Sequence, residues 1–451
     1  MANNSQGIKL LGYILLKPGL SKMNGATILF ASVTGIPFLV VINFIQPYIL
    51  TAMLDIPTAQ HGSISGYLAI VHEIIMIVLT GPAGALADRI GRRRVMTVGF
   101  LLASVGLMIY PWALTITGLM FIRCLYAVGA AAMVSGISVF LADYPQEKSR
   151  GKLIAMAGVL NGVGILLLTA TGGSLPKWLV AAGYEQIPAG RIAMALIGII
   201  GLLSSLIIYF GFKNGDRGTQ LQNSEPILKL LAQGFSAARN PRIAVSYASA
   251  FAARGDVVVI GTYVSLWGTQ AGIADGLLEE NALARATIIF ATIQTAALIA
   301  SPIIGIMNDR INRVTALIIG MGLAALGYIL FGLQTTPLGS SAMGIAFILG
   351  IGQISAILAG TTLIGQEADP KITGATIGVW SFCGAVGTMI GSLLGGLLFD
   401  WWRPGAPFLL MGSLNLLVMI AAIYVRIRYR QEETLNIMAT PADNPTESST
   451  D

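Results

Sequence analysis

Ionisable side chains inside long apolar stretches are the residues of this sequence that could carry chemistry. They lie deep within stretches long enough to cross a bilayer, and they are His72, Glu73, Arg123, Arg254 and Asp256. A charge at the centre of a bilayer costs at least about 2.5–3.5 kcal/mol, so each group is expected to face a water-filled cavity or a partner. Such groups can bind a charged solute or pass a proton, although each could also serve in a structural ion pair.

Arg254 and Asp256 stand two residues apart in one apolar stretch. On a helix this spacing separates two side chains by about 200° around the axis, so they cannot share one face. We expect one of them to face the cavity while the other pairs with a neighbouring helix. We favour Arg254 as the contact to a bound solute and Asp256 as its regulator or as a proton carrier.

Glu73 follows a face of small and polar residues, Gly66, Ala69 and Thr80, which could meet another helix or a cavity. Burial disfavours a charged carboxylate and a nearby arginine favours it, and this competition lets a proton site respond to a bound solute. His72 could carry a proton, or it could be a hydrogen-bonded packing residue. Both interpretations stay open.

Uncharged polar side chains in other stretches could line the same cavity and supply specificity. These candidates are Asn43, Gln46, Tyr126, Gln353 and Trp380. Tryptophan and tyrosine also have a simpler role as anchors at the membrane interface.

The composition excludes an ordinary soluble protein. Hydrophobic residues make up 55% of the chain and charged residues only 11%, against about a quarter in soluble domains. The net charge of +6 comes from basic residues scattered among short loops, so we expect no nucleic-acid partner. There is no P-loop and no nucleophile elbow. With two cysteines in apolar runs and only two histidines, we expect no disulfide, metal site, cofactor or enzyme activity.

A helix needs about 20 consecutive apolar residues to cross a bilayer, and the chain holds twelve such stretches. We therefore predict an all-α membrane protein with twelve transmembrane helices, so that both termini lie on one side. The helices are expected at 28–50, 63–84, 94–112, 114–141, 151–173, 190–212, 242–268, 283–308, 313–334, 341–365, 371–400 and 405–429.

The distribution of basic residues predicts the orientation in the membrane. The segments on the side of the termini hold most of the 27 lysines and arginines, whereas the other side holds Lys177, Arg191, Arg285 and Arg403. Because positively charged loops stay in the cytoplasm, both termini are expected to be cytoplasmic. The short loops and the polar start, without a cleavable signal peptide, favour a bacterial inner membrane.

A polar stretch divides the chain into halves. Along the chain we expect a cytoplasmic N-terminal tail (1–27), a six-helix bundle (28–212), a cytoplasmic linker (213–241), a second six-helix bundle (242–429) and a disordered cytoplasmic tail (430–451). Apolar residues at helical spacing between Glu225 and Arg239 predict an amphipathic helix on the inner leaflet within the linker. The preceding Asn214–Gly218 reads as a flexible turn.

The loop after the second stretch gathers charges and glycines. Its key residues are Gly84, Asp88, Arg89, Gly91, Arg92 and Arg93. Their spacing resembles the loop between helices 2 and 3 of the major facilitator superfamily. A shorter echo in the second half, Gly305 with Asp309 and Arg310, resembles the same loop in a parallel repeat. The alternative is an ordinary basic loop beside a membrane.

This resemblance implies two six-helix bundles around a central cavity that opens to either side in turn. It also implies that the loop charges close the cytoplasmic side of the outward-open state by contacts between the halves. Carried over to this chain, Asp88, Arg89 and Arg92 would be gating residues. Asp309 and Arg310 would be their counterparts in the second half.

Two further patterns match the superfamily only in part. Arg123 lies in a stretch that resembles the helix-4 motif, whose arginine is associated with proton-coupled members, but Tyr126 and Ala127 stand in place of glutamine and glycine. The helix-5 pattern typical of drug exporters is incomplete, because Gly158-x3-Gly162 is followed by Val163-Gly-Ile without a proline. This weakens an exporter assignment and leaves the direction of transport open.

The resemblance covers residues 28–429 and implies a secondary transporter. With two deep arginines, we expect a monomer in the lipid bilayer that moves a small anionic or zwitterionic organic solute by alternating access, coupled to protons. One alternative is a proton-driven exporter of multiple drugs or amphipathic cations, with Glu73 or Asp256 binding the cation. A second alternative is a transport-inactive membrane sensor or scaffold.

Overall fold

The computed structural model describes residues 7–213, 227–369 and 372–439. Within these ranges it contains 12 helices that are long and apolar enough to cross a membrane. In lipid a helix satisfies its backbone hydrogen bonds internally, which is why uninterrupted apolar runs of this length fold this way. The all-α membrane fold with twelve spans that the sequence predicts is confirmed.

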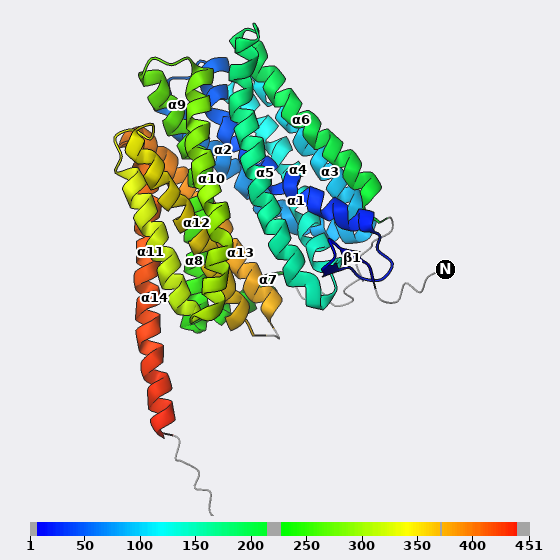
Figure 1. Ribbon diagram of the computed structural model, residues 1–451, viewed down its shortest axis with the longest axis vertical. Coiled ribbons are helices and arrows are strands. Elements are labelled where there is room, and N and C mark those ends of the chain that lie inside the picture. The colour runs from blue at the N-terminus through cyan, green and yellow to red at the C-terminus, as the bar shows by residue number, and fades with distance from the viewer. Residues whose placement is uncertain (1–6, 214–226, 370–371, 440–451) are drawn as a thin grey trace, which may run out of the picture.

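The first six spans form one bundle, coloured blue to green in Figure 1. Its helices are α1 (Lys22–Tyr48), α2 (His61–Ile90), α3 (Arg92–Ile109), α4 (Ile116–Asp143), α5 (Glu147–Ala181) and α6 (Gln186–Gly211). Short helical segments extend three of them: a π-helix (Ile49–Met53) after α1, and 3₁₀ turns before α2 (Thr58–Gln60) and after α3 (Tyr110–Trp112).

The remaining six spans form the second bundle, which lies beside the first (Figure 1). One span combines α8 (Pro241–Val259), a π-helix (Ile260–Val264) and α9 (Ser265–Ala274). The others are α10 (Glu279–Arg310), α11 (Arg313–Gly332), α12 (Ser340–Glu367), α13 (Thr373–Trp401) and α14 (Ala406–Ala439).

The linker between the bundles contains the short amphipathic helix α7 (Ile227–Ser236), followed by a 3₁₀ turn (Ala237–Arg239). Tyr247 of α8 donates a hydrogen bond from its hydroxyl to the backbone O of Gly234 at 2.8 Å. A Cβ atom on Gly234 would lie 2.5 Å from the backbone O of Ala375 on α13, so only glycine permits this approach. The linker helix is therefore packed on the second bundle. The turn expected at Asn214–Gly218 lies outside the described residues.

Both ends of the chain are more ordered than the sequence predicted. Strands β1 (Lys9–Leu10) and β2 (Ile14–Leu15) form an antiparallel hairpin. It is held to the first turn of α5, where the backbone N of Leu15 donates to Ser149 Oγ at 3.1 Å. α1 starts at Lys22 rather than 28, because Ser21 and Asn24 form a capping box there.

At the other end, α14 continues to Ala439, whereas disorder was expected from residue 430. The residues after Arg430 begin Gln-Glu-Glu-Thr-Leu, and glutamine, glutamate and leucine are good helix formers; no proline occurs before Pro441. The rest of the tail, 440–451, lies outside the described residues.

The helix directions define two faces of the molecule. We call the end at which α1 begins and α14 ends the terminal face, and the other end the opposite face (Figure 1). Where both partners are described, the hydrogen bonds that join the bundles lie towards the opposite face. Asp400 at the end of α13 accepts from the backbone N–H groups of Gly62 and Ser63 in the first turn of α2, at 2.9 and 2.7 Å. Gln186 Nε2 donates to Glu279 Oε2 at 2.6 Å.

Candidate functional site

The middle of the molecule places a carboxylate and an arginine from different bundles near one another. Glu73 lies near the middle of α2 and Arg254 lies towards the middle of its span, on α8. Their charges interact, but no direct ion pair joins them in the described part of the chain. Glu73 is half-buried and Arg254 is exposed. A guanidinium at this depth cannot face hydrocarbon, so we infer that water reaches Arg254 between the bundles.

Arg123 of α4 is the largest of the fully buried side chains, at 1% exposure. Its Nη2 donates to Asn43 Oδ1 of α1, while its Nε and Nη1 have no partner among the described residues. The Arg123 charge also acts on Glu73. Unpaired donors on a buried cation are costly, and a guanidinium fork matches carboxylate and phosphate groups well. Arg123 is therefore suited to an anionic ligand.

His72 and Tyr126 pack beside this arginine. The ring of His72 lies 5.8 Å from that of Tyr126, centroid to centroid, and His72 is 6% exposed. The Tyr126 hydroxyl donates to the backbone O of Phe38, which ties α4 to α1. The Arg123 guanidinium lies 6.0 Å from the Tyr126 ring centroid. These contacts place His72 and Tyr126 in the packing between α1, α2 and α4 that holds Arg123 in position.

Trp380 of α13 lies next to Arg254. The guanidinium carbon is 5.9 Å from the indole centroid, and the Trp380 Nε1 atom has no partner among the described residues. One turn further on, a Cβ atom on Gly384 would lie 2.6 Å from the Arg254 side chain, so glycine makes room for the arginine stem. The indole therefore offers Arg254 an aromatic face and a bound solute one hydrogen-bond donor.

Asp256 lies elsewhere, inside the second bundle. Its two carboxylate oxygens accept from Asn415 Nδ2 of α14, at 2.9 and 3.0 Å, and Asp256 is fully buried. Tyr328 of α11 lies close enough to interact with it. Arg254 therefore faces the boundary between the bundles, while Asp256 joins α8 to its neighbours.

One of the uncharged candidates, Gln46, serves the packing. Gln46 Nε2 donates to Ser65 Oγ at 2.7 Å, and Gln46 Oε1 accepts from the Tyr110 hydroxyl at 3.1 Å. Both ends of this buried amide are thus engaged between α1, α2 and the turn after α3. Gln353 of α12 is 6% exposed, and no contact with Glu73 or Arg254 is found for it among the described residues.

Two further amide side chains lie on α5 and α10, helices of different bundles that approach one another. Asn161 of α5 and Gln294 of α10 each sit near the middle of their spans, and each has a buried side-chain oxygen without a partner among the described residues. A Cβ atom on Gly162 would lie 3.3 Å from Leu298, so these helices approach one another here. The available signal was an amide near the middle of each apolar run.

The charged side chains of the site have the chemistry to bind a charged group. Arg123 and Arg254 each carry a positive charge and Glu73 can carry one negative charge, so the three side chains leave an excess of positive charge near the middle of the spans. Among the described residues, no group of three or more His, Cys, Asp or Glu side chains could hold a metal ion. The arrangement can hold an anionic group and exchange it against the Glu73 carboxylate.

A family model described as Major Facilitator Superfamily matches residues 26–291 and 279–440, which together cover most of the chain. The chain belongs to the major facilitator superfamily. The twelve-helix fold that the sequence predicted is that of this superfamily.

Relatives and solved structures agree with this membership. The chain is 24% identical over 396 residues to the magnetosome protein MamH of Paramagnetospirillum magneticum, covering 86% of this chain and 88% of the relative. It is 27% identical over 393 residues to the magnetosome protein MamZ of Magnetospirillum gryphiswaldense, covering 84% of this chain but only 59% of the longer MamZ. It is 24% identical over 366 residues to the methyl viologen resistance protein SmvA of Salmonella typhimurium, covering 73% and 74%.

Among solved structures, the nucleoside transporter NupG superimposes with a TM-score of 0.67 at 12% identity, over 90% of this chain and 99% of that one. A bacterial homologue of the human lysosomal transporter Spinster, inward-facing and unoccupied, gives 0.66 at 17% identity, over 91% and 98%. At these identities the likeness shows the fold alone. It carries no information about the substrate.

The superfamily's signature loop is engaged within its own bundle in this structure. Arg92 pairs with Asp88 at 3.2 Å and with Asp143 at the end of α4. In the second bundle Arg313 pairs with Asp309 at 3.2 Å. Where both partners are described, none of these ion pairs crosses between the bundles. The gating contacts that the resemblance implies are thus not made in the state observed.

Of the other residues in the two loops, two arginines are exposed and two glycines meet backbone or packing constraints. Arg89 and Arg310 are exposed at the terminal face. Gly91 has a φ of +105° between α2 and α3, a backbone conformation that favours glycine. Gly84 lets α2 approach α4, since a Cβ atom there would lie 3.2 Å from Ser135 Oγ.

Proposed function

We propose that this chain is a secondary active transporter that moves a small anionic or zwitterionic organic solute by alternating access, with protons as the coupling ion. The observation that carries the proposal is the placement of Glu73 and Arg254 on different bundles, close enough to interact yet not paired directly. A solute bound between them touches both halves at once. Its binding and release can therefore change how the halves sit against one another.

The charges favour an anionic group on the solute. Glu73 is the one acidic group found acting on Arg254 among the described residues, so an incoming carboxylate or phosphate can neutralise the positive charge that remains on Arg123 and Arg254. The unpaired Nε and Nη1 atoms of Arg123 supply directional donors for it. A zwitterion fits equally well, because its cationic group can approach Glu73.

Proton coupling follows from competition for Arg254. When an anionic solute binds Arg254, Glu73 loses the charge that stabilises its ionised form and can take up a proton. When the solute leaves, Arg254 again favours the ionised carboxylate and the proton is released. Solute and proton would then move together. Asp256 is placed less well for this role, because it is buried against Asn415.

The contacts between the bundles support alternating access. The halves are joined towards the opposite face through Asp400, Gly62 and Ser63, while the ion pairs at the terminal face stay within each bundle. We take the terminal face as cytoplasmic, because it carries most of the basic loop residues, and the membrane as a bacterial inner membrane. The state described is then inward-open, and Asp88 and Asp309 would form contacts between the halves in the outward-open state.

A second candidate is the export of amphipathic cations. The relative named for methyl viologen resistance favours it. In this chain Glu73 would bind the cation, and Trp380 would offer its aromatic face. The neighbouring guanidinium groups of Arg123 and Arg254 disfavour it, because they repel a cation.

A thermal-shift screen of the purified protein separates the two candidates. Matched panels of small organic anions, zwitterions and lipophilic cations are added at equal concentrations. A ligand at about 100 times its Kd stabilises the folded state by about 2.7 kcal/mol. Stabilisation by anions or zwitterions that is lost in Arg123→Gln or Arg254→Gln supports the proposal. Stabilisation by cations that is lost in Glu73→Gln would contradict the proposal and support the cation exporter instead.

A further inference from the structure

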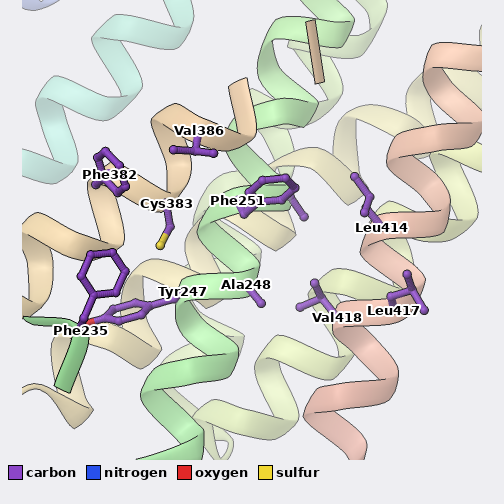
Figure 2. Close-up of a pocket in the computed structure, with 11 residues that line it drawn as sticks. Phe235, Tyr247, Ala248, Phe251, Phe382, Cys383, Val386, Leu414, Leu417 and Val418 are labelled. Carbon is purple, nitrogen blue, oxygen red and sulfur yellow. The ribbon is translucent and has the colours of Figure 1, made fainter. Parts of the chain in front are cut away.

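A groove on the outside of the second bundle is separate from the site between the bundles. It has a volume of about 410 Å³ and is bounded by α7, α8, α13 and α14. In Figure 2, Phe235, Phe382 and Cys383 form one wall, and Leu414, Leu417 and Val418 of α14 form the other. Tyr247, Ala248, Phe251 and Ala252 of α8 also line it.

The groove faces the surroundings of the bundle. Leu417 is 62% exposed, Phe235 48% and Phe382 38%. α8, α13 and α14 all belong to membrane spans, and α7 is an amphipathic helix of the kind that lies at a membrane interface. The medium at its mouth is therefore the lipid of the leaflet at the terminal face.

Specific contacts hold the groove in shape. The Tyr247 hydroxyl donates to the backbone O of Gly234 at 2.8 Å, which fixes α7 against α8. The rings of Phe235 and Phe382 meet edge to face with centroids 6.3 Å apart. On the side of the terminal face, the groove is thus bounded by a linker helix tied to both α8 and α13.

A stripe on α14 leads from the groove to the headgroup region. Leu417, Ala421, Tyr424 and Arg428 follow one another at intervals of three or four residues, which places them on one side of the helix. From Val418 to Arg428 the helix rises about 15 Å. There, Arg428 Nη1 donates to the Tyr424 hydroxyl at 3.3 Å, at the end of the apolar span. Aromatic and basic residues of this kind sit at lipid headgroups.

We propose that the groove binds one acyl chain of a phospholipid from the leaflet at the terminal face, with the phosphate near Tyr424 and Arg428. The apolar lining suits a hydrocarbon chain, and the arginine supplies the complementary charge for the phosphate. The bound chain would fill the space between α13 and α14 and support α7 and α8 from the membrane side. The chain enters from hydrocarbon, so the gain comes from packing contacts, and binding should tighten with each methylene that contacts the lining until the groove is full.

Native mass spectrometry of the detergent-solubilised full chain tests this. The probes are phosphatidylglycerols with saturated chains of increasing length, titrated at fixed protein concentration. Ala248→Phe fills the groove, and Ala232→Phe makes the same change on an exposed position of α7 outside it. We expect one lipid to bind the natural chain and Ala232→Phe with rising affinity up to a limiting length. In Ala248→Phe the affinity should fall at least ten-fold.

The outcomes are distinct. Affinity that does not depend on chain length, or that falls equally in the two alanine variants, would overturn the groove as the binding site. Arg428→Gln should weaken the binding of phosphatidylglycerol but leave the binding of a neutral monoacylglycerol unchanged. An equal loss of affinity for both lipids would overturn the phosphate assignment.

Labelling of the Cys383 thiol provides a second test if Ala248→Phe does not fold. In a Cys124→Ser background it is the sole remaining thiol. A long-chain phosphatidylglycerol should slow its reaction with an apolar maleimide, and a short-chain one should not. Equal rates would contradict the proposal.

Discussion

The carboxylate of Asp400, at the end of α13, caps the first turn of α2 in the other bundle. It accepts hydrogen bonds from the backbone N–H of Ser63 at 2.7 Å and from the Ser63 hydroxyl at 2.6 Å. Acidic groups at a helix N-terminus are stabilising because they offset its unsatisfied N–H groups and its dipole. This cap joins two halves that must separate here if the opposite face is to open.

Asp400→Asn is therefore expected to favour opening of the opposite face. Loss of a charge at a helix N-terminus costs about 1 kcal/mol, which is about a five-fold change in the ratio of the two states. A cysteine at Gln60, in a background without Cys124 and Cys383, should react faster with a water-soluble maleimide. Asp275→Asn removes an exposed charge near the same face and should leave the rate unchanged. An equal rise in both variants would speak against the cap.

Arg254→Gln is expected to weaken binding of the anionic solute about 10- to 100-fold, because a hydrogen bond to a charged group contributes about 1.5–3 kcal/mol. Arg254→Lys should recover part of the loss, since it keeps the charge but not the planar fork. Arg285→Gln, an exposed arginine on α10, is the matched control. Titration by isothermal calorimetry measures all three. Unchanged affinity in Arg254→Gln would remove Arg254 from the site.

Asp256→Asn is expected to leave solute affinity within about two-fold of the natural value, because Asp256 does not face the boundary between the bundles. Asn415→Ala should instead lower stability by about 1–3 kcal/mol, since it leaves a buried carboxylate without its donor. Thermal unfolding and solute binding are measured on the same samples. Loss of binding with intact stability in Asp256→Asn would make Asp256 part of the solute or proton path.

Asp88→Asn is expected to reduce transport without reducing solute binding. Within the described part of the chain, Asp88 pairs only with the nearby Arg92, at 3.2 Å, and this exposed pair contributes little to stability. We propose that Asp88 contributes in the outward-open state, through a contact between the halves. Flux in proteoliposomes should fall several-fold while the thermal shift with solute persists. A scaffold protein would show no flux to lose, and full flux in the variant would remove the gating role.

The architecture was predictable because it rests on the length and spacing of apolar runs. The loop around Asp88 and its echo at Asp309 located the superfamily, and the angle between Arg254 and Asp256 showed that they must face different ways. The sequence does not reveal their partners. Nothing local indicates that Asp256 meets Asn415 or that Glu73 lies near Arg254, because helix packing decides which distant residues become neighbours.

Local signals also misled where packing or capping prevailed. Gln46 looked like a cavity residue, but Ser65 and Tyr110 engage both ends of its amide. The start of α1 was placed late because the capping box of Ser21 and Asn24 lies in a polar segment. The cap made by Asp400 could not be foreseen, since a helix N-terminus gives no sign of a carboxylate from another bundle.

The most direct test of the account compares exchange with accumulation in Glu73→Gln. The probe is the anion that stabilises the natural protein most in the thermal-shift screen. In proteoliposomes, the variant should still exchange labelled for unlabelled solute across the membrane, because Arg123 and Arg254 remain. It should fail to accumulate solute when a pH gradient is imposed, because the proton site is gone. Accumulation at the natural rate, or loss of exchange and accumulation together in a folded variant, would contradict Glu73 as the coupling residue.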